Sequence, residues 1–282
     1  MSTGGHLTSP AARLAAAPPS WATLALAPNP GPMTLDGTNS WMLRAAGHAG
    51  TVVVDPGPLD EPHLARLAAH PVELVLITHG HFDHTESIDR FVELTGARVR
   101  AKDAEWCRGG EPLAVGEVIS AGGLDLRVVA APGHTADSVA FAVAGDEPGV
   151  LTGDTVLGRG TTVVTWPDGD LGDYLASLAR LSALGPVPVL PGHGPALADC
   201  AGAADHYLAH RAERLDQVRG ALRAGARTPG EVVATVYAEV DRGLWPAAEM
   251  SVRAQLAYLA ELGELEPEVV ADPGPGETAT EP

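Results

Sequence analysis

Residues 78–84 read THGHFDH, so three of the chain's 11 histidines and one aspartate fall within a single short segment. The segment follows VELVLI, an apolar run at 72–77 that predicts a buried strand, and the motif therefore begins where that strand ends. In nearly extended backbone, residues two apart face the same side, so His79 and His81 can bind one metal ion. Asp83 and His84 lie one bend further on and can bind a second ion. The fold must therefore bring further donors to the end of this strand.

Three such donors are present elsewhere in the chain, and they are needed because a tetrahedral zinc ion takes about four nitrogen, sulfur or oxygen ligands. Each follows a glycine in a loop after a strand-like run: His134 in APGHTADS, Asp154 in LTGDTVLG and His193 in LPGHGP. The glycine allows the backbone to approach a site closely. The other histidines lack such loops and are interpreted as surface or structural residues, with His210 the hardest to place. They are His6, His48, His63, His70, His206 and His210.

The elements around these loops alternate between two types, which predicts a layered α/β fold. Strands are expected where short β-rich runs end in turn residues. These runs are 38–44, 51–54, 74–78, 97–101, 124–130, 138–143, 150–153 and 187–190. Apolar residues at helical spacing predict helices over 59–70, 86–95 and 171–184.

The C-terminal part has a different, helical pattern. A helix is expected from Asp205 to about Arg227, and TPGE at 228–231 then predicts a capping box at the start of a second helix. A third helix is expected from Trp245 to Leu262, with Gly263 as a left-handed C-cap. ELEPEVV at 264–270 predicts a short wing strand. Three helices and a strand resemble a winged-helix appendage.

The order and spacing of the donor residues resemble the metallo-β-lactamase superfamily of binuclear hydrolases over about residues 20–200. The resemblance implies an αβ/βα sandwich, and about two Zn²⁺ ions per chain with iron or manganese as alternatives. It implies that the first ion is bound by His79, His81 and His134. It implies that the second is bound by Asp83, His84 and His193, with Asp154 bridging both. Asp55, in VVVDPGP, matches a family aspartate that holds the metal loop, although an aspartate before proline is also an ordinary turn residue.

Particular residues narrow the resemblance to one part of the superfamily. Antibiotic-hydrolysing members replace the bridging aspartate, whereas Asp154 is present here, as in the glyoxalase II and ribonuclease Z branches. Flavo-diiron members carry Glu where His81 stands, so His81 favours hydrolysis. Four longer segments resemble the branch called β-lactamase-like protein two, whose members carry a small winged-helix-like C-terminus. The segments are 29–41, 153–164, 191–195 and 210–218.

The expected domain organisation follows from these patterns. Residues 1–18 and 271–282, rich in Pro, Gly and small polar residues, are predicted to be disordered tails. Residues 19–204 are expected to form the hydrolase domain and residues 205–270 the winged-helix-like C-terminal domain. No feature of the sequence predicts an oligomeric state.

Composition limits the partners and the compartment. With 36 acidic and 18 basic residues, the net charge of −18 repels nucleic acid and acidic membranes at long range, so duplex DNA is not an expected partner. No stretch approaches the roughly 20 apolar residues of a membrane helix, and the N-terminal residues do not resemble a signal sequence. The two cysteines, Cys107 and Cys200, form no CxxC motif, which favours a reducing cytoplasm.

The predicted reaction is hydrolysis of an ester, thioester or phosphodiester. In such sites two ions, roughly 3.5 to 4 Å apart, deprotonate a shared water and polarise the substrate oxygen. Asp83 and Asp154 are expected to position the resulting hydroxide, which makes them the catalytic candidates. The substrate class stays open between a small ester or thioester and single-stranded RNA.

Separate observations support these substrate hypotheses. Arg219, Arg223 and Arg227 are spaced by four on one expected helix face, with Arg211 and Arg214 nearby, which favours an endoribonuclease unless the face is simply solvated. However, RNA-binding proteins usually carry stacking aromatics, and only 4% of this chain is aromatic. The acidic surface and shared ligand set favour a hydroxyacylglutathione hydrolase, although its larger basic C-terminal region is not found here.

Two alternatives come from outside hydrolysis. A mononuclear iron persulfide dioxygenase shares the HxHxDH motif, and one iron per chain with oxygen consumption would identify it. A DNA-binding regulator is suggested by the winged-helix tail, but the complete ligand set would then have no role.

Overall fold

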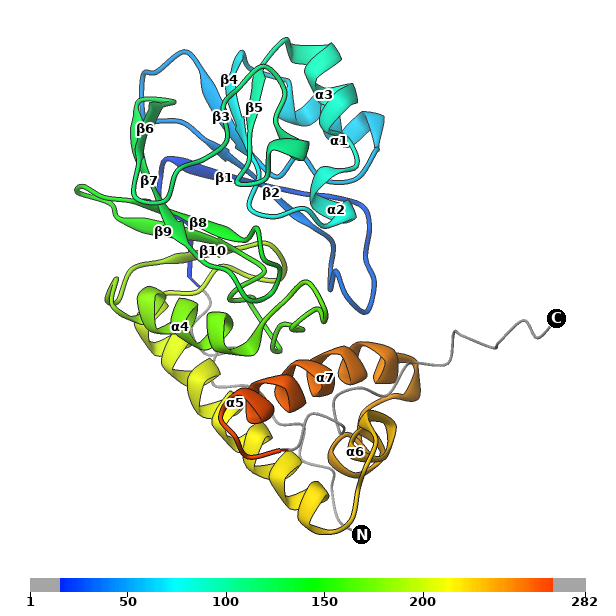
Figure 1. Cartoon of the computed structure of the whole chain (residues 1–282). Coiled ribbons are helices and arrows are strands. Elements are labelled where there is room, and N and C mark those ends of the chain that lie inside the picture. The colour runs from blue at the N-terminus through cyan, green and yellow to red at the C-terminus, as the bar shows by residue number, and fades with distance from the viewer. Residues whose placement is uncertain (1–15, 266–282) are drawn as a thin grey trace, which may run out of the picture.

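The computed structural model describes residues 16–265, and these form two mixed five-stranded sheets that face each other (Figure 1). The first sheet contains, in spatial order, β1 (Ala22–Leu26), β2 (Asn39–Leu43), β3 (Thr51–Val54), β4 (Val72–Leu76) and β5 (Arg98–Arg100). The second contains β10 (Val189–Pro191), β9 (Gly149–Gly153), β8 (Val139–Val143), β7 (Leu124–Ala130) and β6 (Val118–Ala121). The β3, β4 and β5 strands run parallel, as do β9 and β10, while the remaining pairs are antiparallel.

Each sheet buries both of its faces, because successive strand side chains point to opposite sides. In β3, Val52 and Val54 pack between the sheets, together with Leu126 and Phe141 of the second sheet. Val53, the residue between them, packs against the helices on the outer face. The apolar runs that predicted buried strands therefore supply two cores at once.

Helices cover the outer face of each sheet (Figure 1). α1 (Glu61–Leu67) and α3 (Ile88–Thr95) lie on the first sheet, and α4 (Leu171–Ser182) lies on the second together with α5 (Cys200–Arg223). The layers thus run helix, sheet, sheet, helix. This arrangement confirms the αβ/βα sandwich that the resemblance implied.

The C-terminal part consists of α5, α6 (Pro229–Val236), a 3-10 turn η3 (Arg242–Leu244) and α7 (Trp245–Glu261). The predicted capping box is confirmed, since Thr228 accepts from the backbone N–H of Glu231 and Glu231 accepts from that of Thr228. The left-handed Gly263 is also confirmed, with φ of 72°. Apolar residues of α6 and α7 share one core with α4 and α5, so the C-terminal helices are packed onto the sandwich.

Some predicted boundaries are wrong. The helix expected over 205–227 begins at Cys200, where Asp199 caps it, and ends at Arg223, because Gly225 adopts φ of 111°. The helix expected over 86–95 corresponds to α3 and begins at Ile88, and a separate single turn, α2 (Phe82–Thr85), precedes it. The edge strands β1 and β6 were not predicted, since their exposed positions interrupt the apolar pattern.

Other predictions concern residues beyond the described part of the chain. The wing strand over 264–270 lies mostly outside the described residues, as do most of the predicted N-terminal tail and all of the C-terminal tail. Within residues 16–265, none of the helices is long and apolar enough to span a bilayer. The division into domains at residue 204 stays a prediction, and α5 crosses that position without a break.

Candidate metal centre

The THGHFDH segment is held in place by Asp55, which directly follows β3. Its Oδ1 accepts from the backbone N–H of Thr78 at 2.8 Å, and its Oδ2 accepts from Thr78 Oγ1 at 2.7 Å. Oδ2 also accepts from Nδ1 of His84 at 2.9 Å, and the whole carboxylate is buried. These contacts join both ends of the motif to β3. They support the interpretation of Asp55 as the residue that holds the loop over that of an ordinary turn residue.

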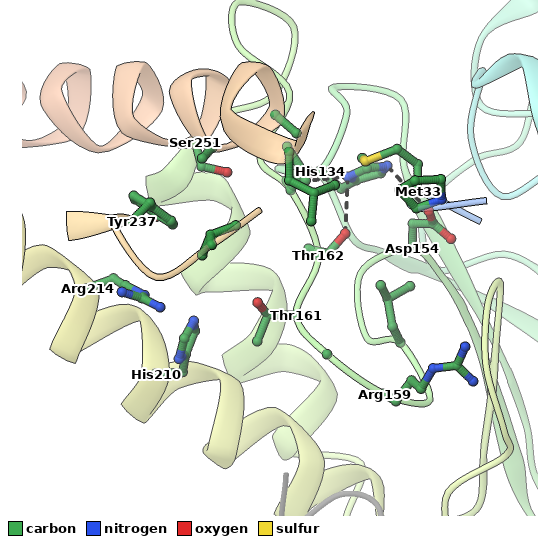
Figure 2. Close-up of a pocket in the computed structure, with 18 of the residues that line it drawn as sticks. Met33, His134, Asp154, Arg159, Thr161, Thr162, His210, Arg214, Tyr237 and Ser251 are labelled. Atoms are coloured by element: carbon green, nitrogen blue, oxygen red, sulfur yellow. Dashed lines mark hydrogen bonds and ion pairs between the residues drawn. The ribbon is translucent and has the colours of Figure 1, made fainter. Parts of the chain in front are cut away.

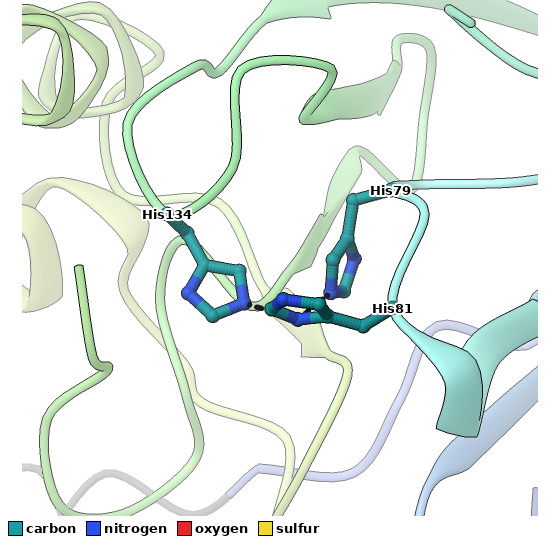
Figure 3. A group of neighbouring side chains, drawn as sticks. All are labelled: His79, His81 and His134. Atoms are coloured by element: carbon teal, nitrogen blue, oxygen red, sulfur yellow. Dashed lines mark hydrogen bonds between the residues drawn. The ribbon is translucent and has the colours of Figure 1, made fainter. Parts of the chain in front are cut away.

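Three imidazoles converge at the first group of donors (Figure 3). Nδ1 of His81 lies 3.0 Å from Nε2 of His79 and 3.0 Å from Nε2 of His134. His79 and His81 face the same point because His81 has an extended backbone, with φ of −64° and ψ of 144°. His134 reaches this point from the loop after β7. The structure thus brings together the donors expected to share the first ion.

The second group combines one carboxylate with two imidazoles. Oδ2 of Asp83 lies 3.3 Å from Nε2 of His84 and 3.2 Å from Nε2 of His193. Asp83 and His84 lie on the single turn α2, which turns them away from His79 and His81, and His193 follows β10. The donors expected to share the second ion are therefore also adjacent.

Asp154, which follows β9, lies between the two groups. Its Oδ2 is 3.3 Å from Nε2 of His193 and 3.8 Å from Nε2 of His134, while its Oδ1 is 3.6 Å from Nε2 of His84. One carboxylate thus touches donors of both groups. This is the position that the resemblance predicted for a bridging ligand.

The remaining ring nitrogen of several imidazoles is occupied by the protein. Nδ1 of His134 donates to the carbonyl of Val163 at 2.6 Å, and Nδ1 of His193 donates to that of Gly37 at 3.1 Å. Nδ1 of His84 is likewise held by Asp55. Because these bonds occupy Nδ1, the Nε2 atoms of all three rings are directed into the cluster.

The cluster fits metal cations. Within the described part of the protein, Nε2 of His84 and Oδ1 of Asp154 are buried and make no hydrogen bond, so both atoms are available to a bound cation. Burial disfavours a charged His84, yet Asp55, Asp83 and Asp154 outweigh it and raise its pKa to about 9. The imidazoles in turn hold the pKa of Asp154 well below its usual range despite its burial. This field attracts positive charge, and histidine nitrogens with carboxylate oxygens form a donor set that can hold metal cations.

A pocket of about 320 Å³ opens beside His134 and Asp154 (Figure 2). One wall is the 157–163 loop and the other is formed by α5 and residues 237–251. His210 lies in this wall, although its sequence context predicted a surface or structural residue. The sequence did contain a sign that His210 is functional, because HRAER at 210–214 belongs to one of the segments that carry the family resemblance.

The prediction that Arg219, Arg223 and Arg227 form a row on one helix face is wrong. Arg227 lies beyond the end of α5 and donates to the carbonyls of Leu222 and Ala226. Arg219 is paired with Glu264 at 2.7 Å. These arginines therefore form no continuous basic stripe within residues 16–265.

Comparison with known families and structures identifies two regions. Residues 33–193 match the model described as metallo-beta-lactamase superfamily, and residues 228–266 match the beta-lactamase associated winged helix domain. The "Beta-lactamase-like protein 2 homolog" of Drosophila melanogaster is 31% identical over 274 residues, which covers 86% of this chain and 89% of that protein.

Two further similarities bear on the fold and the chemistry. An Aspergillus chevalieri protein named "Atrochrysone carboxyl ACP thioesterase" is 32% identical over 230 residues, 76% of this chain and 72% of that protein. The crystal structure of a metallo-beta-lactamase family protein from Thermus thermophilus is 26% identical with a TM-score of 0.73. The similarity covers 86% of this chain and 94% of that one.

Proposed function

Because the chain belongs to the metallo-β-lactamase superfamily, we propose that it is a binuclear zinc hydrolase whose substrate is a thioester. It is a hydrolase of this fold with His and Asp candidates for the metal site. The observation that supports two ions is the convergence of seven donor side chains in two adjacent groups joined by Asp154. A mononuclear iron enzyme would leave the second group without a role.

In this proposal each donor has one task. His79, His81 and His134 would hold the first ion, Asp83, His84 and His193 would hold the second, and Asp154 would be shared between them. When bound, the zinc ions supply Lewis acidity and lower the pKa of water at neutral pH. Asp55 holds the orientation of His84, and the Val163 carbonyl holds that of His134.

The two carboxylates of the cluster differ in exposure, which separates their roles. The Asp83 side chain is 27% exposed and that of Asp154 is 10% exposed. Thr38 Oγ1 donates to Asp83 Oδ2 at 2.9 Å and thereby fixes its direction. Asp83 is therefore the more accessible of the two carboxylates that would position the hydroxide, and Asp154 the more buried.

Features of the pocket favour a thioester as the substrate over single-stranded RNA. The pocket is small and its walls are largely apolar, with Val240, Leu244 and Ala247 among them. The arginine row that favoured RNA does not exist as one face. A relative bears the name of a thioesterase, which agrees with this substrate class.

The test compares substrates on protein reconstituted with zinc. Acyl thioesters of N-acetylcysteamine, S-lactoylglutathione, single-stranded RNA and bis(p-nitrophenyl) phosphate are assayed side by side. We expect hydrolysis of a thioester that is abolished by chelation, restored by zinc, and reduced at least about 100-fold in Asp154→Ala. The exposed Asp146→Ala is the matched control and should retain wild-type activity. Zinc-dependent cleavage of RNA with no thioester turnover would overturn the proposal.

A further inference from the structure

The pocket beside the metal donors contains two arginines with no acidic partner. Among residues 16–265, neither Arg211 nor Arg214 forms an ion pair with a carboxylate. Arg214 donates to neutral acceptors, the side chain of Gln217 and the carbonyl of Val236. Arg211 is 3% exposed, donates to the carbonyl of Thr162, and leaves its Nε without a hydrogen bond. Within the described part of the chain, neither guanidinium therefore has a carboxylate partner, although Arg211 lies over the ring of Tyr174 and Arg214 over that of Tyr237.

Elsewhere on the molecule some arginines pair with carboxylates, while others, such as Arg180 and Arg227, donate to backbone carbonyls. Arg90, Arg108 and Arg219 each pair with at least one carboxylate, as expected in a chain with twice as many acidic as basic residues. Among the described residues, the only carboxylate that lines the pocket is Asp154, which belongs to the metal donors. Arg211 is buried, where an unpaired cation is unfavourable, and the half-buried Arg214 faces the pocket with no carboxylate partner among residues 16–265, so an anionic group of a ligand can pair with it.

Arg214 and the metal donors lie at opposite ends of the pocket. Figure 2 shows His134 and Asp154 at one end and the side chains of His210 and Arg214 at the other, projecting from α5. Burial and the two neighbouring arginines lower the pKa of His210 to about 4, so this imidazole is a neutral hydrogen-bonding group beside them. A ligand that fills the pocket therefore meets the metal donors with one end and positive charge with the other.

The size of the pocket limits the group that fits. About 320 Å³ corresponds to about ten non-hydrogen atoms, if each occupies about 30 Å³ as a water molecule does. The part of the pocket wall formed by η3 and the residues next to it is lined by the apolar side chains of Val240, Leu244 and Ala247. This combination suits a short apolar chain that ends in an anion.

We propose that the pocket binds the acyl part of the substrate and selects acyl groups that carry an oxyanion at their far end, with Arg214 as its principal partner. The inference rests on the proposed thioesterase function, because that function places the scissile bond at the metal donors. Arg211 supplies positive charge from the wall and also holds Thr162, so it is left unaltered in the test. A carboxylate and a phosphate share this chemistry.

The test measures selectivity for the distal charge. The substrates are adipoyl, hexanoyl and 4-phosphonobutanoyl thioesters of N-acetylcysteamine. The proteins are the zinc-loaded wild type, Arg214→Gln, Arg214→Lys and the control Arg223→Gln, an exposed arginine at the end of the same helix. We expect the wild type to prefer an anionic substrate over hexanoyl in kcat/KM. In Arg214→Gln this preference falls about 10- to 100-fold, mainly through KM. Arg214→Lys retains part of it, and Arg223→Gln changes neither value.

A binding measurement separates this inference from the proposed function. Adipate and monomethyl adipate are titrated calorimetrically into the same proteins, so that the difference in Kd reports the second carboxylate alone. A difference of about ten-fold or more that disappears in Arg214→Gln supports the subsite even if no thioester is hydrolysed, in which case only the proposed reaction fails. The inference is overturned if the wild type prefers neither the anionic thioesters in kcat/KM nor adipate over monomethyl adipate in Kd. It is also overturned if both preferences survive in Arg214→Gln. The phosphonate arm identifies which oxyanion is preferred.

Discussion

Oδ2 of Asp55 lies 2.9 Å from Nδ1 of His84, and both side chains are buried. Asp55 adopts φ of 54°, a left-handed conformation that aspartate tolerates better than most residues. Three hydrogen bonds hold it there, two of them to Thr78 at the start of the histidine motif. Asp55, at the end of β3, thus orients His84, a donor in the segment that follows β4.

Asp55→Asn is expected to weaken zinc binding about 10- to 100-fold, because a residue that orients a ligand contributes on this scale. The amide keeps the size of the side chain but cannot accept with both terminal atoms. Competition with a chromogenic chelator measures the affinity. The exposed Asp146→Asn should match the wild type, and equal affinity in Asp55→Asn would contradict the assigned role.

Zinc stoichiometry should follow the two donor groups. His134→Ala removes a histidine from the first donor group, and His193→Ala removes one from the second. Each variant is therefore expected to retain about one tightly bound zinc, while the wild type is expected to hold about two. Elemental analysis after gel filtration counts the ions, with the exposed His70→Ala as the control. Loss of both ions in both variants would indicate a single cooperative site instead.

Gly192→Ala is expected to disturb the cluster without touching any donor. A Cβ at this position would lie 2.3 Å from Oδ1 of Asp154 and 3.0 Å from Cε1 of His84. Because these side chains are confined, we expect lower zinc affinity and a loss of about 1–3 kcal/mol in the free energy of unfolding. Gly220→Ala on α5 is the matched change, since a Cβ there meets no atom within 4 Å. Thermal unfolding with and without zinc reports both effects.

Arg211→Lys should affect zinc binding from outside the cluster. Arg211 donates to the Thr162 carbonyl, and the next residue, Val163, accepts from Nδ1 of His134. Lysine keeps the charge but loses the planar contact over the Tyr174 ring, whose centroid is 5.0 Å away. We expect the affinity for one of the two zinc ions to fall about ten-fold. A lowered Tm with unchanged affinity for both ions would show a purely structural role.

His63 is expected to make stability depend on pH. It is fully buried, its Nε2 lies 2.9 Å from Ser40 Oγ, and burial together with nearby Arg66 lowers its pKa to about 4 from 6.5. Between these values the unfolded chain binds the proton more readily, so the free energy of unfolding falls as pH drops from 6.5 to 4. The total loss is on the order of 2 to 3 kcal/mol.

Urea unfolding at pH 7 and pH 5 measures this effect. His63→Gln should be less stable than the wild type at pH 7, and the difference between the two proteins should shrink at pH 5. The exposed His70→Gln should keep a constant difference from the wild type. A constant difference for His63→Gln would contradict the shifted pKa.

The sequence determined the local parts of the molecule, because these depend on near neighbours. Spacing of two in extended backbone placed His79 and His81 on one side, and TPGE encoded the capping box at Thr228. The alternation of buried residues within the strands follows from the same short-range geometry. Edge strands such as β1 were missed because partial exposure weakens that pattern.

Only the tertiary structure decided what lies beside the motif. His134, Asp154 and His193 meet it because β4, β7, β9 and β10 end near one another across two sheets, which no local pattern specifies. Likewise, α5 buries Arg211 and directs Arg214 into a pocket, although on the chain both resemble the paired Arg219. Contacts between residues far apart in sequence depend on how whole elements pack. The donor types could therefore be predicted from the chain, while the pocket beside them could not.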